Sequence, residues 1–170
     1  MIFRTMFTKQ KALPIALLAV ALLAAWFIFA IDRDERAIRK QLDELAELVE
    51  KDGAVSQFDA LARSRKFKEL FAPAALIEYM PGRALPRSTD AMQTGFLSVW
   101  RQIESASIRV SQHEVEIGSP ATEAVSSFYA KCRVVMNGSE RMGDTVSYRS
   151  YWVKRDGEWL IDRIIAERFE

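Results

Sequence analysis

Residues 148–162 read YRSYWVKRDGEWLID, and this stretch decides the fold. Its centre, Asp156-Gly157, favours a two-residue hairpin turn, because both turn positions need a positive φ that these residues tolerate. Aromatic and β-branched residues on either side are typical of strands. The stretch therefore predicts a hairpin between a strand from about Asp144 to Lys154 and a last strand from Glu158 to Glu167.

Two further strands precede this hairpin. Apolar or small residues occupy every second position over Ala124–Met136, which predicts one long strand with a buried face. Upstream, the alternation of Ile108 and Val110 continues in the opposite phase at Val115, and such a slip inside a strand indicates a β-bulge. Asn137-Gly138 is a second hairpin signal. The C-terminal part of the chain thus predicts four antiparallel strands.

The preceding part of the chain predicts helices. Within Glu35–Lys51, apolar residues recur at intervals of four, three and four, which predicts an amphipathic helix. Ser56-Gln57-Phe58-Asp59 matches a capping box that opens a second helix, and Pro73 is expected to end it. A short strand over Ala75–Met80 follows, and then a third helix with its cap at position 88 or 89. The order α-α-β-α followed by four strands predicts an α+β fold with helices on one face of the sheet.

Residues Ala12–Ile31 contain no charged side chain, and this run predicts a transmembrane anchor. Twenty helical residues reach about 30 Å, the thickness of the hydrocarbon core of a bilayer. Arg4, Lys9 and Lys11 precede the run, whereas charges of both signs are nearly balanced just after it. The positive-inside tendency places the N-terminus in the cytoplasm and the domain outside it, which in a bacterium means a single pass through the inner membrane and a periplasmic domain.

The same run has a second interpretation as a cleaved signal peptide. The small residues Ala19-Val20-Ala21 could form the cleavage site. Cleavage there would leave a strongly apolar N-terminus exposed, and we therefore favour an uncleaved signal anchor. The expected organisation is a cytoplasmic leader over residues 1–11, an anchor over 12–31, a juxtamembrane helix over 32–55 that is the first helix of the domain, and the remainder of the domain over 56–170.

Composition excludes several classes of protein. Beyond residue 31, 139 residues remain, enough for one domain, with 21 basic residues against 23 acidic ones. This balance does not suit an extended nucleic-acid groove, so no nucleic-acid partner is expected. With one cysteine, one histidine and carboxylates at no ligand spacing, neither a disulfide framework nor a metal site is expected. Because the sequence holds no glycine-rich phosphate loop, no cofactor is expected either.

Four stretches resemble the nuclear-transport-factor-2-like superfamily, also called the cystatin-like α+β roll. They are residues 67–79, the helix expected near 89–100, residues 113–117 and residues 148–162. The resemblance covers roughly Ile38–Phe169. It implies a cone-shaped roll in which a curved, mostly antiparallel sheet wraps around a helix-lined cavity, often with dimers formed through the sheet. Members of the superfamily include ketosteroid isomerases, dehydratases, polyketide cyclases and catalytically inactive binding or assembly domains.

His113 and Asp162 are the candidate catalytic residues. His113 is the single histidine and lies beside the change of strand phase, where acid/base work would need a nearby carboxylate. The resemblance to dehydratases that pair His with Asp implies Asp162, on the last strand, as that partner. The alternative is a strand histidine at a solvated bulge. Cys132 falls on the most apolar strand face and is interpreted as a small buried hydrophobe.

A second group of residues could line a polar cavity or form a protein interface. They are Tyr129, Arg133, Tyr148, Arg149, Tyr151 and Trp152. Because Tyr148 and Trp152 fall on the opposite strand phase from Tyr151, aromatic side chains remain for another contact whichever face covers the core. The loop Pro81–Arg87 is expected to rim the cavity. Four cations within Arg63–Lys68 indicate a solvated helix face, with contact to anionic headgroups as the alternative.

Together these features favour a membrane-anchored, extracytoplasmic module that binds a protein partner or a small ligand without catalysis. A homodimer is the simplest protein partner. The alternative is a small-molecule isomerase, dehydratase or cyclase that uses a cavity carboxylate or His113. A third interpretation is a structural subunit of an envelope complex. A pocket that encloses His113 or Asp162 beside a second polar group would favour the enzyme.

Overall fold

A computed structural model gives the fold and describes the backbone of residues 9–136, 138–143 and 145–167. It describes the side chains of residues 29–167, apart from 80, 137, 140–142 and 144. The chain divides into two compact units, residues 1–34 and 35–170. Helix α1 (Lys9–Val49) begins in the first unit and ends in the second.

The predicted leader and anchor fall in the first unit. Residues 1–8 of the leader lie outside the described residues, and residues 9–34 form the first part of α1. Most of the anchor predicted over Ala12–Ile31 lies outside the residues whose side chains are described. Among the described residues, no helix has both the length and the hydropathy of a membrane span. Membrane anchoring therefore stays a prediction.

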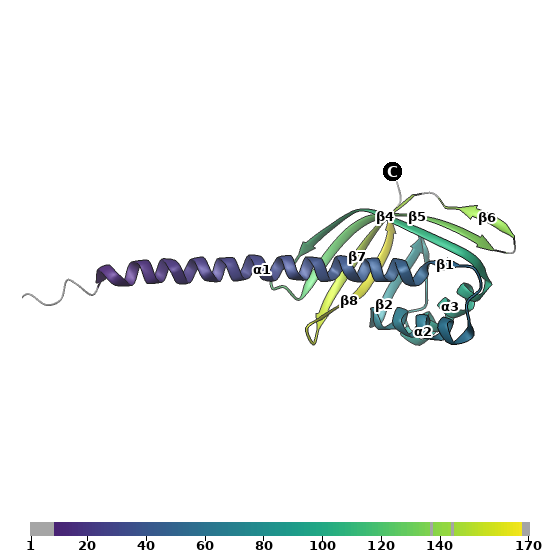
Figure 1. The fold of residues 1–170 in the computed structure, drawn as a ribbon, viewed down its shortest axis with the longest axis horizontal. Coiled ribbons are helices and arrows are strands. Elements are labelled where there is room, and N and C mark those ends of the chain that lie inside the picture. The colour runs from purple at the N-terminus through teal and green to yellow at the C-terminus, as the bar shows by residue number, and fades with distance from the viewer. Residues whose placement is uncertain (1–8, 137, 144, 168–170) are drawn as a thin grey trace, which may run out of the picture. The chain divides into compact units, whose positions relative to one another are not determined.

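The second unit is an α+β fold with one mixed sheet. After α1 come β1 (Lys51–Asp52), α2 (Gln57–Glu69), β2 (Phe71–Met80), β3 (Arg83–Ala84), α3 (Thr89–Gln102), β4 (Ile103–Ile117), β5 (Glu123–Met136), β6 (Ser139–Met142), β7 (Val146–Arg155) and β8 (Glu158–Glu167). The strand order is β1-β4-β5-β7-β8-β2-β3, with β6 paired to β5. Among the described strands, β2 and β8 pair parallel and the other neighbours pair antiparallel. Figure 1 shows these strands bending into a curved sheet, as the resemblance implies.

The predicted hairpins and bulge are present. Asp156 and Gly157 have φ of 52° and 86°, as a type I′ turn between β7 and β8 requires. The second predicted hairpin joins β5 to β6, whose strands pair antiparallel. The register of β4 on β5 shifts between Ser111 and Glu114, where Gln112 has a φ of 51°. The change of hydrophobic phase in β4 is therefore a β-bulge.

Two predicted boundaries are wrong. Helix α2 ends at Glu69, and Pro73 lies inside β2 rather than at the end of a helix. The register of β2 on β8 shifts in the first half of β2, so Pro73, which has no N–H to donate, lies in the irregular part of the pairing. The strand predicted from Asp144 begins at Val146, and the short strand β6 precedes it.

Serine side chains begin both of the shorter helices, as predicted. The Ser56 Oγ accepts a hydrogen bond from the Asp59 amide at 3.1 Å and caps α2. The Ser88 Oγ accepts one from the Ala91 amide at 3.4 Å and caps α3. Each serine satisfies a backbone N–H that has no partner within its helix.

The core lies between one face of the sheet and the helices. Trp152, Trp159 and Ile161 of the sheet and Ile38 and Leu42 of α1 are each at most 2% exposed. The alternation predicted for residues 124–136 is confirmed, because the buried side chains of β5 all fall on this face. We call the face that packs on the helices the inner face of the sheet, and the opposite one the outer face. The buried residues of β5 are Ala124, Ser126, Phe128 and Ala130.

Candidate functional site

A cavity of about 920 Å³ lies between the inner face of the sheet and the second half of α1. Its described lining is mostly aliphatic and aromatic. The lining residues are Leu42, Leu45, Ala46, Val49, Phe67, Phe71, Ile77, Tyr79, Pro81, Arg83, Leu85, Ile108, Val110, Phe128, Ala130, Cys132, Val134, Gly143, Val146, Tyr148 and Ile164. This size and this composition are typical of a site for an apolar small molecule.

The periodicity of each helix or strand brings its apolar residues to the cavity. Leu42, Leu45 and Val49 follow one another at helical spacing, so α1 presents them on one side. On the sheet, Val110 pairs directly with Ala130, and alternation along each strand returns to the same face at every second residue. The predicted helical and strand patterns therefore account for most of this wall.

Strand β2 supplies the part of the wall that the sequence did not predict. Ile77 pairs with Ile164 in the parallel ladder between β2 and β8, and the Leu85 amide donates to the Ile77 carbonyl at 2.8 Å. The parallel pairing has no sequence signal comparable to a hairpin turn. The loop predicted to rim the cavity does contribute to it, through Pro81, Arg83 and Leu85.

The cavity contains few groups that could take part in proton transfer. The Tyr148 hydroxyl donates to the Tyr79 carbonyl at 3.0 Å, and burial raises the pKa of the Tyr148 phenol. Burial also raises the pKa of the Cys132 thiol, so both groups are neutral near pH 7. Arg83 is exposed, and no carboxylate or histidine occurs among the described lining residues. This lining can bind an apolar molecule but offers no acid/base pair.

His113 lies on β4 at the bulge and outside the described lining of the cavity. Its carbonyl accepts a hydrogen bond from the Arg39 guanidinium of α1, and its ring meets the Phe128 ring edge-on, with 5.9 Å between centroids. Its Nε2 is buried without a hydrogen-bond partner among the described residues. Burial, followed by the charge of Arg39, lowers the pKa of His113 below its ordinary 6.5, against opposing effects of Asp43 and Glu35. The imidazole is therefore neutral near pH 7.

Asp162 lies on β8, far across the sheet from His113. Strands β5 and β7 separate β4 from β8. Asp162 is the extra residue where the register on β7 shifts, because Tyr151 pairs with Arg163 and Trp152 with Ile161. It is half-buried and absent from the described cavity lining. The structure does not bring the two candidate catalytic residues together.

The six residues predicted as a ligand or interface group divide between the two faces. Trp152 is only 1% exposed and belongs to the core. Tyr148 stacks on Phe128, with 5.5 Å between ring centroids, and lines the cavity. The other four alternate with buried residues and so lie on the outer face, where Arg163 stacks over the Tyr151 ring at 4.7 Å. These four are Tyr129, Arg133, Arg149 and Tyr151.

Within the part of the chain that the structure describes, no cluster of three or more His, Cys, Asp or Glu side chains could hold a metal ion. Two of the four cations in the basic run of α2 form structural contacts, and the other two, Arg65 and Lys66, are exposed. Arg63 donates to the carbonyls of Glu47 and Glu50 near the end of α1, and Lys68 pairs with Asp90.

Comparisons with known proteins identify the fold. No protein-family model matches the chain, and no curated protein matches it. Many solved structures do match. One is a candidate scytalone dehydratase from Novosphingobium aromaticivorans, with a TM-score of 0.64 and 17% identity over 79% of this chain and 83% of that one.

Two other solved structures are similar to the same extent. An NTF2-like protein with a cystatin-like fold from Novosphingobium aromaticivorans matches with a TM-score of 0.61 and 11% identity, over 85% of this chain and 86% of that one. The Kfla4162 protein from Kribbella flavida matches with a TM-score of 0.63 and 12% identity, over 80% and 90%. The domain therefore has the cystatin-like α+β roll that the sequence predicts, and identities this low establish the fold alone.

Proposed function

We propose that this domain binds an uncharged, largely apolar small molecule in the inner cavity and does not catalyse acid/base chemistry. One observation carries the proposal. The cavity of about 920 Å³ has, among its described lining residues, five aromatic rings and many aliphatic side chains but no carboxylate or histidine. An isomerase or dehydratase of the predicted kind needs a titratable group within hydrogen-bond reach of its substrate.

The lining also indicates what kind of ligand fits. Phe67, Phe71, Phe128 and Tyr148 surround an apolar space, which favours a molecule with rings or a long hydrocarbon chain. The Tyr148 hydroxyl already donates to Tyr79, so a hydroxyl or carbonyl on the ligand would gain little there. Affinity would come mostly from apolar surface removed from water, at roughly 25 cal/mol per Å² before the losses of association.

The single cysteine gives a direct measurement of cavity occupancy. Cys132 lines the cavity, and the chain has no other thiol, so alkylation by N-ethylmaleimide reports on this one residue. We expect naphthalene to slow the alkylation of Cys132 in the full chain. An alkylation rate that stays unchanged up to the solubility limit of naphthalene would count against the proposal.

A matched pair of variants separates filling of the cavity from general effects. Ala46→Phe places a ring into the cavity from α1 and should abolish protection by naphthalene. Ser127→Phe adds the same ring on the outer face and should leave protection unchanged. Equal loss of protection in both variants would indicate an altered fold instead of a filled cavity.

We propose in addition that residues 12–31 anchor this domain to the bacterial inner membrane with the domain in the periplasm. The charge-free run and the three basic residues before it support the proposal. A reporter that is active only in the periplasm, fused after Glu170, should be active. A silent fusion would indicate that the domain lies on the cytoplasmic side. Release of the protein into the soluble periplasmic fraction would favour the cleaved signal peptide.

We also propose that the outer face contacts a protein partner, with a second copy of the chain as the simplest one. Tyr129 and Tyr151 are half-buried on this face, beside Arg149 and its ion pair with Glu167 at 3.0 Å. Analytical ultracentrifugation of the full chain in maltoside micelles should give a dimer. Co-purification of another envelope protein in mild detergent would instead favour the structural subunit of a larger complex.

The second candidate function is an acid/base enzyme that uses His113. The observation in its favour is the buried, unpartnered Nε2 of His113 close to Phe128, a residue that does line the cavity. The test begins with extraction of the purified native chain and identification by mass spectrometry of any small molecule bound to it. That molecule is then incubated with fresh native protein and with His113→Gln, and its conversion is followed by mass spectrometry. Conversion by the native chain alone would establish the enzyme and overturn the non-catalytic proposal.

A further inference from the structure

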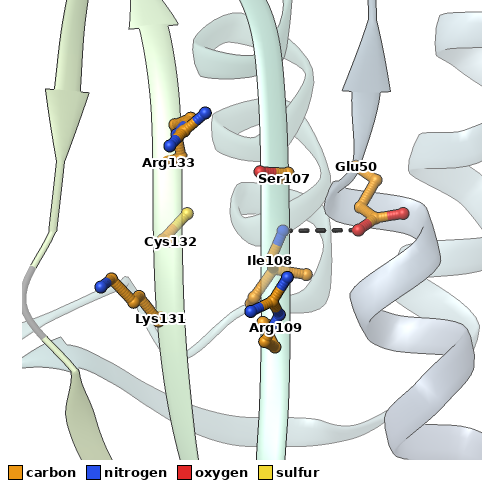
Figure 2. Close-up of a pocket in the computed structure, with 7 residues that line it drawn as sticks. All are labelled: Glu50, Ser107, Ile108, Arg109, Lys131, Cys132 and Arg133. Carbon is orange, nitrogen blue, oxygen red and sulfur yellow. Dashed lines mark hydrogen bonds between the residues drawn. The ribbon is translucent and has the colours of Figure 1, made fainter.

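A second hollow, of about 450 Å³, lies on strands β4 and β5 beside the end of α1 (Figure 2). In contrast to the inner cavity, its lining is mostly polar and cationic. The lining residues are Glu50, Ser107, Ile108, Arg109, Lys131, Cys132 and Arg133. Ile108 and Cys132 also contribute to the wall of the inner cavity, so the two sites lie on opposite sides of the same pair of strands.

Strand register places the three cations on one face. Arg109 pairs directly with Lys131, and Ser107 pairs directly with Arg133. Residues directly opposite one another point to the same side of a sheet, with Cβ atoms about 4.5–5.5 Å apart. All four side chains are exposed, and they alternate with Ile108 and Cys132, so the four lie together on the outer face.

This arrangement of charge is unfavourable unless an anion is present. Like charges directly opposite on neighbouring strands destabilise a sheet. Neither Arg109 nor Lys131 forms an ion pair with any side chain that the structure describes. Glu50 is the carboxylate in the described lining, and its Oε1 accepts a hydrogen bond from the Ile108 amide at 3.4 Å, drawn as a dashed line in Figure 2.

Three acidic residues of this face lie at the other end of the same two strands. Glu114 and Glu116 follow the bulge of β4, and Glu123 begins β5, at the end of the ribbon opposite the three cations. Glu104 lies on β4 nearer the cations, and its Oε1 accepts a hydrogen bond from the Gly138 amide at 2.8 Å.

We propose that this hollow binds the phosphate group of a phosphate ester. A guanidinium can donate two parallel N–H bonds to phosphate oxygens, and an ammonium acts as a compact point charge. Arg109 and Lys131 approach from two strands, and the Ser107 hydroxyl can donate to a further oxygen. A tetrahedral phosphate has enough oxygens for all these donors, whereas a carboxylate has two.

The test is calorimetric titration of inorganic phosphate into the full chain in maltoside micelles at constant ionic strength. Arg109→Gln combined with Lys131→Gln should weaken binding by about tenfold or more, because two charged hydrogen-bond donors are lost. The matched control combines Arg101→Gln with Arg155→Gln, two exposed cations outside the hollow, and should change the affinity by less than about twofold.

Two results of this titration would overturn the proposal. One is the absence of saturable binding of phosphate to the native chain. The other is an equal loss of affinity in both double variants, which would indicate attraction to net charge alone. Circular dichroism of each variant verifies that the fold is intact. Binding to the inner cavity is measured with naphthalene and binding to the hollow with phosphate. A negative result for one ligand therefore leaves the result for the other unchanged.

Further arms of the experiment distinguish a lipid headgroup from a soluble ester. Competition by glycerol 3-phosphate, but not by phosphatidylglycerol added to the micelles, identifies a soluble ligand. Competition by phosphatidylglycerol at lower concentration than glycerol 3-phosphate identifies a headgroup. Either result supports the phosphate site, and the absence of competition by both esters would overturn it.

Discussion

The hydroxyl of Tyr148 donates a hydrogen bond to the main-chain carbonyl of Tyr79 at 3.0 Å. This bond joins β7 to β2 across β8, which lies between them in the sheet. It also occupies the polar end of Tyr148, so the ring alone faces the cavity beside Phe128. One side chain thus holds the wall in place and keeps the cavity apolar.

Tyr148→Phe should destabilise the domain by about 0.5–1.5 kcal/mol, the usual net contribution of one such hydrogen bond. Because the ring is retained, protection of Cys132 by naphthalene should be unchanged. Chemical denaturation followed by tryptophan fluorescence measures the first effect. Tyr151→Phe, on the outer face, is the control and should change stability by less. If Tyr148→Phe abolishes protection, the hydrogen bond to Tyr79 is required to keep the cavity able to take naphthalene, and the ring alone does not suffice.

Lys131→Glu should stabilise the domain by about 0.2–1 kcal/mol, because it converts a like-charge cross-strand pair with Arg109 into an opposite-charge one. The gain should shrink as salt is added. Lys131→Gln removes the repulsion without adding attraction and should give a smaller gain. Denaturation midpoints of the three proteins at low and high salt measure these differences. A destabilised Lys131→Glu would show that the two cations are not in repulsive contact.

Trp152→Phe should be more destabilising than Trp159→Phe by about 1 kcal/mol or more. Both indoles are buried, but only the Trp152 Nε1 donates to described partners, Ser126 at 3.0 Å and Ser150 at 2.9 Å. The Nε1 of Trp159 is buried without a described partner, so its replacement leaves no acceptor unpaired. The free energies of unfolding of the two variants are compared by chemical denaturation. Equal losses would mean that ring volume alone determines the effect.

The stability of the domain should fall on acidification because of His113. Burial and Arg39 lower its folded pKa below the ordinary 6.5, so the unfolded chain takes up a proton first as the pH falls. The contribution is fully present above about pH 6.5 and is lost as the pH falls toward the folded pKa. In His113→Gln this part of the pH dependence should disappear. The free energy of unfolding of the native chain and of His113→Gln is measured from neutral to mildly acid pH. The same slope against pH in both proteins would exclude His113 as the cause.

Several elements could be predicted because their signals are local. The Asp156-Gly157 turn depends on two backbone conformations that few residue pairs adopt easily. The caps at Ser56 and Ser88 need only a hydroxyl within three residues of an unpaired amide. The bulge beside His113 was visible because a one-residue slip moves every following side chain to the other face.

The candidate site was predicted only in part. Alternation placed Phe128, Ala130 and Cys132 on one face of β5, and helical spacing placed Leu42 and Leu45 on one side of α1. The pairing of His113 with Asp162 was suggested by resemblance and depended on which strands are neighbours. Two strands lie between them in the structure.

By itself, the sequence determined the α+β class, the turns, the caps and the inward or outward direction of residues along each strand. These properties follow from short-range sterics and from the periods of helix and strand. Only the tertiary structure decided that β2 pairs parallel with β8, that Ile77 reaches the cavity, and that Arg109 lies opposite Lys131. Such contacts depend on register and on the order of strands, which arise from the packing of the whole sheet rather than from any one stretch of chain.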